Sequence, residues 1–204
     1  LARLDPAIPA YTAPQNIMDA IAGFPLHRGV LALARRTPRP TAANLLPALQ
    51  PQPLLVLVGL SNHDNVGACF RNAAALGADA ILLDETSCDP LYRKSIRVSA
   101  GTALSLPFAH TGNGADIIAA LKAASYESWS LTPSNGAPIH SVQPPEKLAL
   151  ILGPEGPGLP AALMDQTTRI SIPMAEGVDS LNVATAGAIA LSCVFAARPR
   201  RTTG

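Results

Sequence analysis

At residues 148–160 the chain reads LALILGPEGPGLP, an apolar run that gives way to a loop rich in glycine and proline. A short apolar run bounded by turn residues is typical of a strand buried on both faces. The loop differs from a phosphate-binding loop because no Lys-Ser/Thr pair follows its glycines. Pro154 and Pro157 also lack the backbone N–H groups of a phosphate cradle, and Glu155 would repel an anion. The segment therefore predicts a strand followed by a loop for a neutral or cationic ligand.

The rest of the chain after Pro53 alternates between expected strands and helices. We expect strands at 54–59, 80–83, 128–132, 148–152 and 169–172. We expect helices at 116–124 and 181–197, a short one after Pro160, and one that Asp64 or Asn65 caps and Gly77 ends. This alternation predicts an α/β fold, a parallel sheet with helices on both faces. Ligands bind such sheets beyond the carboxyl ends of the strands, here the loops after Gly59, Thr132, Gly153 and Ile172.

Composition sets limits on the class of protein. The chain has 204 residues, 48% of them hydrophobic and 14% charged, as in globular proteins. The formal net charge of +1 gives no overall sign of a nucleic-acid partner, so local basic clusters must carry that argument. No apolar run reaches the roughly eighteen residues of a membrane span, and no signal peptide is recognisable. We expect no membrane association.

Cysteine usage indicates the compartment and argues against a metal site. Cys69, Cys88 and Cys193 are far apart and form no CxxC pair, so zinc and a disulfide framework are not expected. Reduced cysteines are in keeping with a cytoplasmic protein.

The first 53 residues are rich in proline and alanine. Two proline-bearing stretches, 36–41 and 47–53, indicate a linker that ends near Pro53. Before them, residues 27–32 are expected to form a strand that closes a small domain. The sequence begins at Leu1 without a methionine, so we expect a further N-terminal part.

Two more stretches combine polar residues with helix starts. In residues 65–73, NVGACFRNA, Asn65 stands where a strand gives way to a helix, and Arg71 follows within that helix. In residues 178–184, VDSLNVA, Ser180 precedes the final helix as an expected cap, with Asn182 in its first turn. Each pattern by itself is also typical of an ordinary capped helix with a surface arginine. The final helix is apolar nearly all round, which indicates a subunit interface and a homodimer.

Taken together, residues 65–73, 148–160 and 170–184 resemble the three sequence motifs of the SpoU/TrmH family of RNA ribose 2′-O-methyltransferases. The similarity runs from about residue 54 to 197 and is reinforced at 88–94 and 97–101. The resemblance implies S-adenosylmethionine (AdoMet) as methyl donor, a C-terminal trefoil knot of the SPOUT type, a homodimer, and tRNA or rRNA as substrate. It implies no metal.

The resemblance also implies site residues and domain limits. The positions that match the family's catalytic site are Asn65, Arg71, Glu155, Ser180 and Asn182. The positions expected to bind the cofactor are Leu131, Thr132, Gly153, Glu155, Gly158, Ile172, Met174 and Leu181. RNA binding is expected at Arg71, Arg93, Lys94 and Arg97. The implied parts are the end of a ribosomal-protein-like RNA-binding domain (1–40), a linker (41–53), the methyltransferase domain (54–198) and a basic tail (199–204).

The residues leave three further functions open. A family member that binds RNA without catalysis is opposed by the intact catalytic positions, and a nucleotide-dependent oxidoreductase by the lack of GxGxxG after the first strand. Methylation of a base nitrogen instead of the ribose also remains possible. Family proposals make Arg71 the general base, but a guanidinium stays protonated, so a phosphate or oxyanion ligand is the alternative role. His63 is the nearest histidine, and its position suits a loop.

Overall fold

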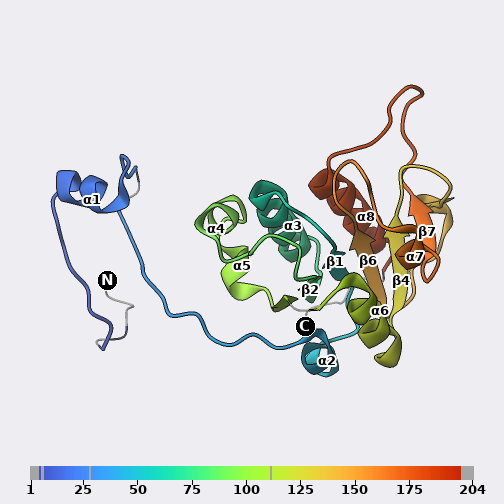
Figure 1. Cartoon of the computed structure of the whole chain (residues 1–204), viewed down its shortest axis with the longest axis horizontal. Coiled ribbons are helices and arrows are strands. Elements are labelled where there is room, and N and C mark those ends of the chain that lie inside the picture. The colour runs from blue at the N-terminus through green and yellow to red at the C-terminus, as the bar shows by residue number, and fades with distance from the viewer. Residues whose placement is uncertain (1–4, 6, 28, 111, 199–204) are drawn as a thin grey trace. The chain divides into compact units, whose positions relative to one another are not determined.

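The computed structural model describes residues 5, 7–27, 29–110 and 112–198 and divides into two units, residues 1–38 and 39–204 (Figure 1). Each unit is considered by itself. The basic tail predicted at 199–204 lies outside the described residues.

The first unit contains one short helix, α1 (Gln15–Ala22), among its described residues. The helix ends at Gly23, and the Asp19 carboxylate accepts hydrogen bonds from Gln15 Nε2 (2.7 Å) and Leu26 N (2.8 Å). The strand expected at 27–32 is not formed in the described part of that segment, so this prediction was wrong. Val30 is 75% exposed, and an isolated extended segment has no partner to pair with.

The second unit is built on a parallel sheet, which confirms the predicted α/β class. Its described strands are β1 (Leu54–Leu57), β2 (Ala80–Leu83), β3 (Phe108–His110), β4 (Glu127–Leu131), β5 (Ala137–Pro138), β6 (Leu148–Leu152) and β7 (Thr168–Ser171). Their order is β3-β2-β1-β6-β4-β7-β5, and every pairing is parallel. The apolar run of 148–152 is thus the central strand, buried along its whole length between β1 and β4.

Helices cover both faces of this sheet, as predicted (Figure 1). One face carries α3 (His63–Ala75), α4 (Arg93–Val98), α5 (Thr102–Ser105) and α8 (Val183–Ala197), and the other α2 (Ala42–Leu45), α6 (Gly114–Ala123) and α7 (Ala161–Met164). Short 3₁₀ turns, η1 (Leu46–Ala48) and η2 (Ile139–Ser141), complete the described elements. Strand β1 shows the alternation: Leu55 and Leu57 join the core cluster under α3 and α8, while Leu54 and Val56 join the opposite one.

The segment predicted as a linker, 41–53, is folded against the sheet instead of forming a free tether. Thr41 Oγ1 accepts a hydrogen bond from Asn44 N (3.3 Å) and so caps α2. Ala42 and Leu46 are buried in the core cluster that contains α6. Apolar burial, which the proline content of this stretch did not reveal, gives the segment its fixed position.

The caps of helices α3 and α8 lie two or three residues away from the predicted ones. Helix α3 is capped by Asn62, whose side chain accepts from Asp64 N (2.8 Å), and not by Asp64 or Asn65. Helix α8 is capped by Asn182 and not by Ser180, which stands too far ahead of the first turn. Asn65 is therefore free to use its side chain elsewhere.

A buried carboxylate fixes the turn between β1 and α3. Asp84 is only 4% exposed and accepts hydrogen bonds from Gly59 N (2.9 Å), Ser87 N (3.0 Å) and Ser87 Oγ (2.7 Å). Thr86 Oγ1 donates to its other oxygen at 2.6 Å. A buried polar group satisfied in this way holds its donors in place. The start of α3 is thereby tied to the end of β2.

Helices α3 and α4 meet at Gly67, and we expect Gly67→Ala to destabilise the protein. A Cβ there would lie 2.7 Å from Ser95 O and 2.9 Å from Val98 Cβ. Alanine favours a helix by about 0.5–1 kcal/mol over glycine, but overpacking costs about 1–3 kcal/mol. We expect a net loss in the free energy of unfolding, measured by equilibrium denaturation.

Gly187→Ala in α8 is the matched control, because its Cβ would meet only a movable methyl, Leu152 Cδ1, at 2.8 Å. It should cost less than Gly67→Ala. Equal losses, or a Gly67→Ala protein as stable as the parent, would contradict the close α3–α4 contact.

Candidate functional site

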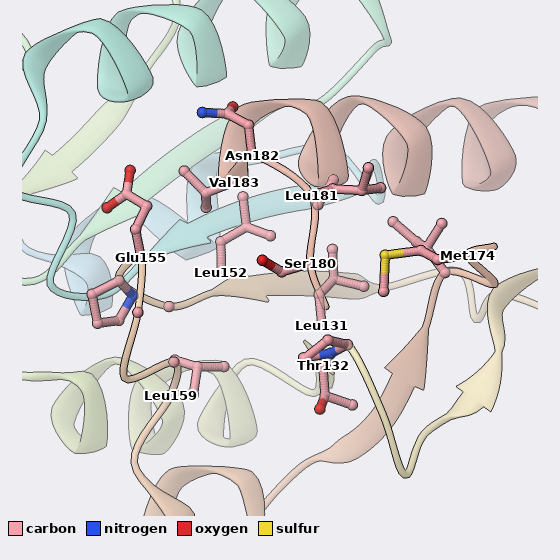
Figure 2. Close-up of a pocket in the computed structure, with 17 residues that line it drawn as sticks. Leu131, Thr132, Leu152, Glu155, Leu159, Met174, Ser180, Leu181, Asn182 and Val183 are labelled. Atoms are coloured by element: carbon pink, nitrogen blue, oxygen red, sulfur yellow. The ribbon is translucent and has the colours of Figure 1, made fainter. Parts of the chain in front are cut away.

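A cavity of about 370 Å³ opens at the carboxyl ends of β4, β6 and β7. Its walls come from the loop after β4, the loop after β6, and the segment that leads from β7 into α8 (Figure 2). Parallel strands bring their carboxyl ends to one edge of the sheet, so three loops far apart in sequence meet there. Glu155 and Asn182 lie toward one end of the cavity, and Met174 lies at the other (Figure 2).

All eight residues predicted to bind a cofactor line this cavity, while their role as contacts stays a prediction. Sequence analysis missed seven further lining residues: Pro133, Leu152, Pro154, Gly156, Leu159, Val183 and Ala186. Six of them stand in a motif already singled out or within two residues of it, and Pro133 follows the predicted Thr132. Their adjacency to predicted residues was the available signal, but Leu152 was assigned only to the core of a strand.

The loop after β6 closes tightly on itself at Gly153. A Cβ on Gly153 would lie 2.6 Å from the backbone nitrogen of Leu159 and 2.7 Å from its Cγ. Gly158 has a φ of +69° and donates its N–H to Pro154 O at 3.2 Å. Glycine is required at both places, one for close approach and one for the left-handed backbone. The loop thus presents a narrow, preformed edge to the cavity.

The cavity carries a single ionisable side chain among the described residues that line it, Glu155. Its other walls are mostly apolar, with Ile172, Met174 and Leu181 on the segment before α8. Without a lysine or arginine in the described lining, the cavity offers no counter-charge to a phosphate. A carboxylate beside apolar walls suits a ligand that is neutral or carries a positive centre.

A chain of hydrogen bonds joins three elements at the edge of the cavity. Asn182 Nδ2 donates to Asn65 Oδ1 (3.0 Å), and Asn65 Nδ2 donates to Glu155 Oε1. Asn182 Oδ1 in turn accepts from the backbone N–H groups of Ala184 (2.9 Å) and Thr185 (3.3 Å) at the start of α8. These hydrogen bonds fix the orientation of the Asn65 amide, because the amide oxygen accepts one bond and the amide nitrogen donates another.

The Glu155 carboxylate also acts on two thiols. The pKa of Cys69 on α3 is raised from 9.0 to about 12, chiefly by burial and further by the charge of Glu155. The pKa of Cys88 is raised by burial, by Glu155 and by Asp89. Both thiols therefore stay protonated near neutral pH, and neither is suited to act as a nucleophile.

The structure brings four of the five predicted catalytic residues together. Glu155, Ser180 and Asn182 line the cavity, and Asn65 is hydrogen-bonded to two of them. Arg71 does not line it: the residue is exposed on α3, and the described residues give its guanidinium no hydrogen-bond or ion-pair partner. Six residues separate it from Asn65, about one and two thirds helical turns, so the two side chains leave α3 on different faces.

Three of the four basic residues predicted to bind RNA are exposed on α4, and the fourth, Arg71, is exposed on α3. Arg93, Lys94 and Arg97 all belong to α4, which packs against α3. Lys94 Nζ forms a half-exposed ion pair with Asp64 Oδ2 at 2.8 Å. Such a surface pair contributes about 0–1 kcal/mol, so it leaves Lys94 available to exchange partners.

Metal-binding and membrane-spanning features are absent from the part of the chain that the structure describes. It contains no group of three or more His, Cys, Asp or Glu side chains placed to hold a metal ion. No helix among the described residues is long and apolar enough to cross a membrane.

We expect Asn182→Ala to lower the free energy of unfolding by about 0.5–2 kcal/mol, as for other lost helix caps. The reason is that Ala184 N and Thr185 N lose their acceptor. Asn182→Asp keeps an accepting oxygen but cannot donate to Asn65, so it should retain most of the stability. Equal losses in chemical denaturation of the two variants would show that the cap is not what Asn182 contributes.

Known proteins share this sequence pattern. Residues 52–192 match the profile of the SpoU rRNA Methylase family. Over 188 residues the chain is 42% identical to a protein of Mycobacterium bovis named as an uncharacterized tRNA/rRNA methyltransferase, covering 89% of this chain and 64% of that protein. It is 30% identical to the 23S rRNA (guanosine-2′-O-)-methyltransferase RlmB of Acinetobacter baylyi, covering 88% of this chain and 75% of that protein.

A solved structure gives the same picture of the fold. The AdoMet-bound rRNA methyltransferase of Sinorhizobium meliloti superimposes with a TM-score of 0.72 at 25% identity, over 78% of this chain and 61% of that one. This chain therefore spans less than two thirds of the length of the mycobacterial relative and of that solved structure.

Proposed function

This chain belongs to the SpoU rRNA methylase family, and from that premise we propose that it methylates a ribose 2′-hydroxyl of structured RNA with AdoMet as donor. The observation that carries the proposal is the cavity with one carboxylate and no basic side chain among its described lining, beside the Asn65–Glu155–Asn182 hydrogen-bond chain. The names of the relatives support rRNA or tRNA as substrate and the ribose 2′-oxygen as the acceptor.

The residues present fit AdoMet. The cavity volume lies in the range of small-molecule sites, about 300–1,000 Å³, and its lining suits a sulfonium better than a phosphate. The apolar side chains of Ile172, Met174 and Leu181 would hold the adenine ring. Backbone groups at Gly153 and Gly158 would read its polar edge, because no Cβ stands in the way.

When bound, AdoMet supplies an already activated methyl group, so the chain's own task is to align the acceptor hydroxyl, whose proton passes to water as its oxygen takes the methyl group. Well-held reactants can gain about 7–11 kcal/mol from positioning. Asn65 uses one amide N–H on Glu155, which leaves its second N–H for an oxygen of the ribose. Ser180 lines the cavity and would orient the same ribose.

Arg71 would grip a phosphate of the target and stabilise the developing oxyanion. Guanidinium groups in general are poor bases, which argues against the base role. Its exposed position on α3, outside the cavity, suits a residue that meets the RNA and not the cofactor.

RNA would be held by Arg71 together with Arg93, Lys94 and Arg97 of α4. Phosphate contacts of this kind make affinity depend on salt concentration but do not distinguish RNA sequences.

We assign residues 1–40 to the end of a substrate-binding domain, since the chain from residue 1 to 38 forms a unit of its own. The tail at 199–204 would add positive charge. Three free cysteines support a cytoplasmic location.

We further infer a trefoil knot and a homodimer. Strand β7 pairs with β4 on the side of β4 that faces away from β6. Helix α8, which follows β7, packs against β6 and α3. The segment between β7 and α8 therefore crosses back over the carboxyl edge of the sheet, where the cavity lies. Phe195 on α8 is 57% exposed, which supports a partner for this helix.

One pair of measurements tests both architectural inferences. We expect sedimentation at twice the mass of one chain, and a crystal structure whose trace through residues 148–198 is threaded. A monomer in solution would refute the dimer, and an unthreaded trace would refute the knot.

The activity is tested by tritium transfer from labelled AdoMet to bulk rRNA and to bulk tRNA. We expect label in one pool, recovered as a 2′-O-methylnucleoside after digestion.

Gly153→Ala should lose AdoMet binding in calorimetry, because its Cβ has no room beside Leu159. Arg71→Ala should bind AdoMet normally but transfer methyl groups at least about 100-fold more slowly.

Arg71→Lys is the matched control, since it keeps the positive charge but lacks the planar guanidinium group. Its rate of methyl transfer should fall between those of the parent protein and Arg71→Ala. AdoMet binding without label in either pool would favour an RNA-binding protein that lacks catalysis. Label recovered as a base-methylated nucleoside would overturn the ribose assignment.

A further inference from the structure

A pair of aromatic rings on the surface takes no part in the proposed site. The Tyr92 and His63 ring centroids are 4.4 Å apart with a tilt of 46°. Tyr92 is 42% exposed, and His63 is partly exposed. A large ring left half in water keeps one face free to pack against a ligand.

Exposed aromatic residues are few in this chain, whose aromatic content is 4%. In the second unit Phe70, Phe108, Tyr126 and Trp129 are buried in the core. Among the described residues of that unit, the exposed Phe and Tyr side chains are Tyr92 and Phe195. Phe195 lies at the opposite end of α8 from Asn182. Tyr92 is thus the exposed ring nearest in structure to the start of α3.

The pair is held rigidly next to the catalytic candidates. His63 is the first residue of α3, and two residues of helix, a rise of about 3 Å, separate it from Asn65. Tyr92 directly precedes α4, where Ser95 Oγ donates to His63 O at 3.2 Å. The close packing of Gly67 against Ser95 joins the same two helices. A platform of this kind would not need to be ordered on binding.

Positive charge follows Tyr92 along α4. Arg93, Lys94 and Arg97 follow Tyr92 in α4, and all three are exposed. Aromatic faces beside a basic surface are the combination with which proteins bind single-stranded nucleic acid: bases stack on the rings while cations meet the phosphates. RNA-reading proteins commonly use bases that have left the helical stack.

We propose that the Tyr92–His63 pair is a stacking platform for an unstacked RNA base at or next to the nucleotide whose ribose is methylated. The inference rests on the proposed function, and it specifies the substrate as an RNA with a base out of its helix. Tyr92 is then a positioning residue: it places the nucleotide over the start of α3 and does not touch the reacting atoms.

The test uses Tyr92→Leu, Tyr92→Phe and, as an exposed apolar control on neighbouring α5, Leu104→Ala (Leu104 is 62% exposed). The probe is a short single-stranded RNA with one 2-aminopurine, whose fluorescence is quenched when it stacks. Loss of one stacked base weakens binding by about 5- to 150-fold. We expect that loss, with loss of quenching, for Tyr92→Leu alone. AdoMet affinity should be unchanged in all three proteins, and KM for RNA should rise in Tyr92→Leu more than kcat falls.

Leucine keeps apolar packing against His63, so the folded state of Tyr92→Leu, checked by its melting temperature, separates stacking from packing. Unchanged quenching and RNA affinity in Tyr92→Leu would overturn the platform, as would an equal loss in Tyr92→Phe, which would point to the hydroxyl. If the parent protein quenches the probe in a Tyr92-dependent way but methylates no RNA, the proposed function fails and the platform stands. If it methylates RNA and Tyr92→Leu has the same KM, the platform alone fails.

Discussion

The hydrogen-bond chain through Asn65, Glu155 and Asn182 joins α3, the loop after β6 and the start of α8. These elements are far apart in the sequence, and each supplies one side chain that forms a hydrogen bond with a side chain of another element. Because an amide orients itself only when both its ends have partners, no member can be removed without leaving a donor or acceptor unpaired. The cavity exists in its present form because these three elements are held together.

The hydrogen bonds among these three side chains lie where helices α3 and α8 begin. Asn65 is in the first turn of α3, and Asn182 caps α8. The amino end of a helix carries a partial positive charge, which stabilises an anion within its first turn. The Glu155 carboxylate is joined to the first of these helices by the hydrogen bond that it accepts from Asn65. Among the described residues, this hydrogen bond and not a basic side chain holds the carboxylate at the edge of the cavity.

Some of this architecture followed from local sequence and some did not. The limits of β2 and β6 were predicted because a short apolar run between turn residues is compatible with few structures besides a buried strand. The caps were misplaced, since Asn, Asp and Ser cluster before both helices and only packing decides which oxygen faces the backbone. Strands β3 and β5 and helices α4 and α5 are too short for a periodic signal and depend on tertiary contacts. The lining residues came from family resemblance, not from periodicity.

If Arg71 binds a phosphate of the RNA as proposed, its place on α3 sets the direction from which the substrate comes. Asn65 faces the cavity through Glu155, while Arg71 leaves α3 on another face and is exposed. A methyl donor in the cavity and a phosphate on Arg71 would therefore lie on two sides of the same helix. The start of α3 lies between them, with the Tyr92–His63 pair and the Lys94–Asp64 ion pair beside it. An RNA that reaches both must lie across this helix end, so the shape of the backbone around one nucleotide, more than overall charge, would decide which RNA fits.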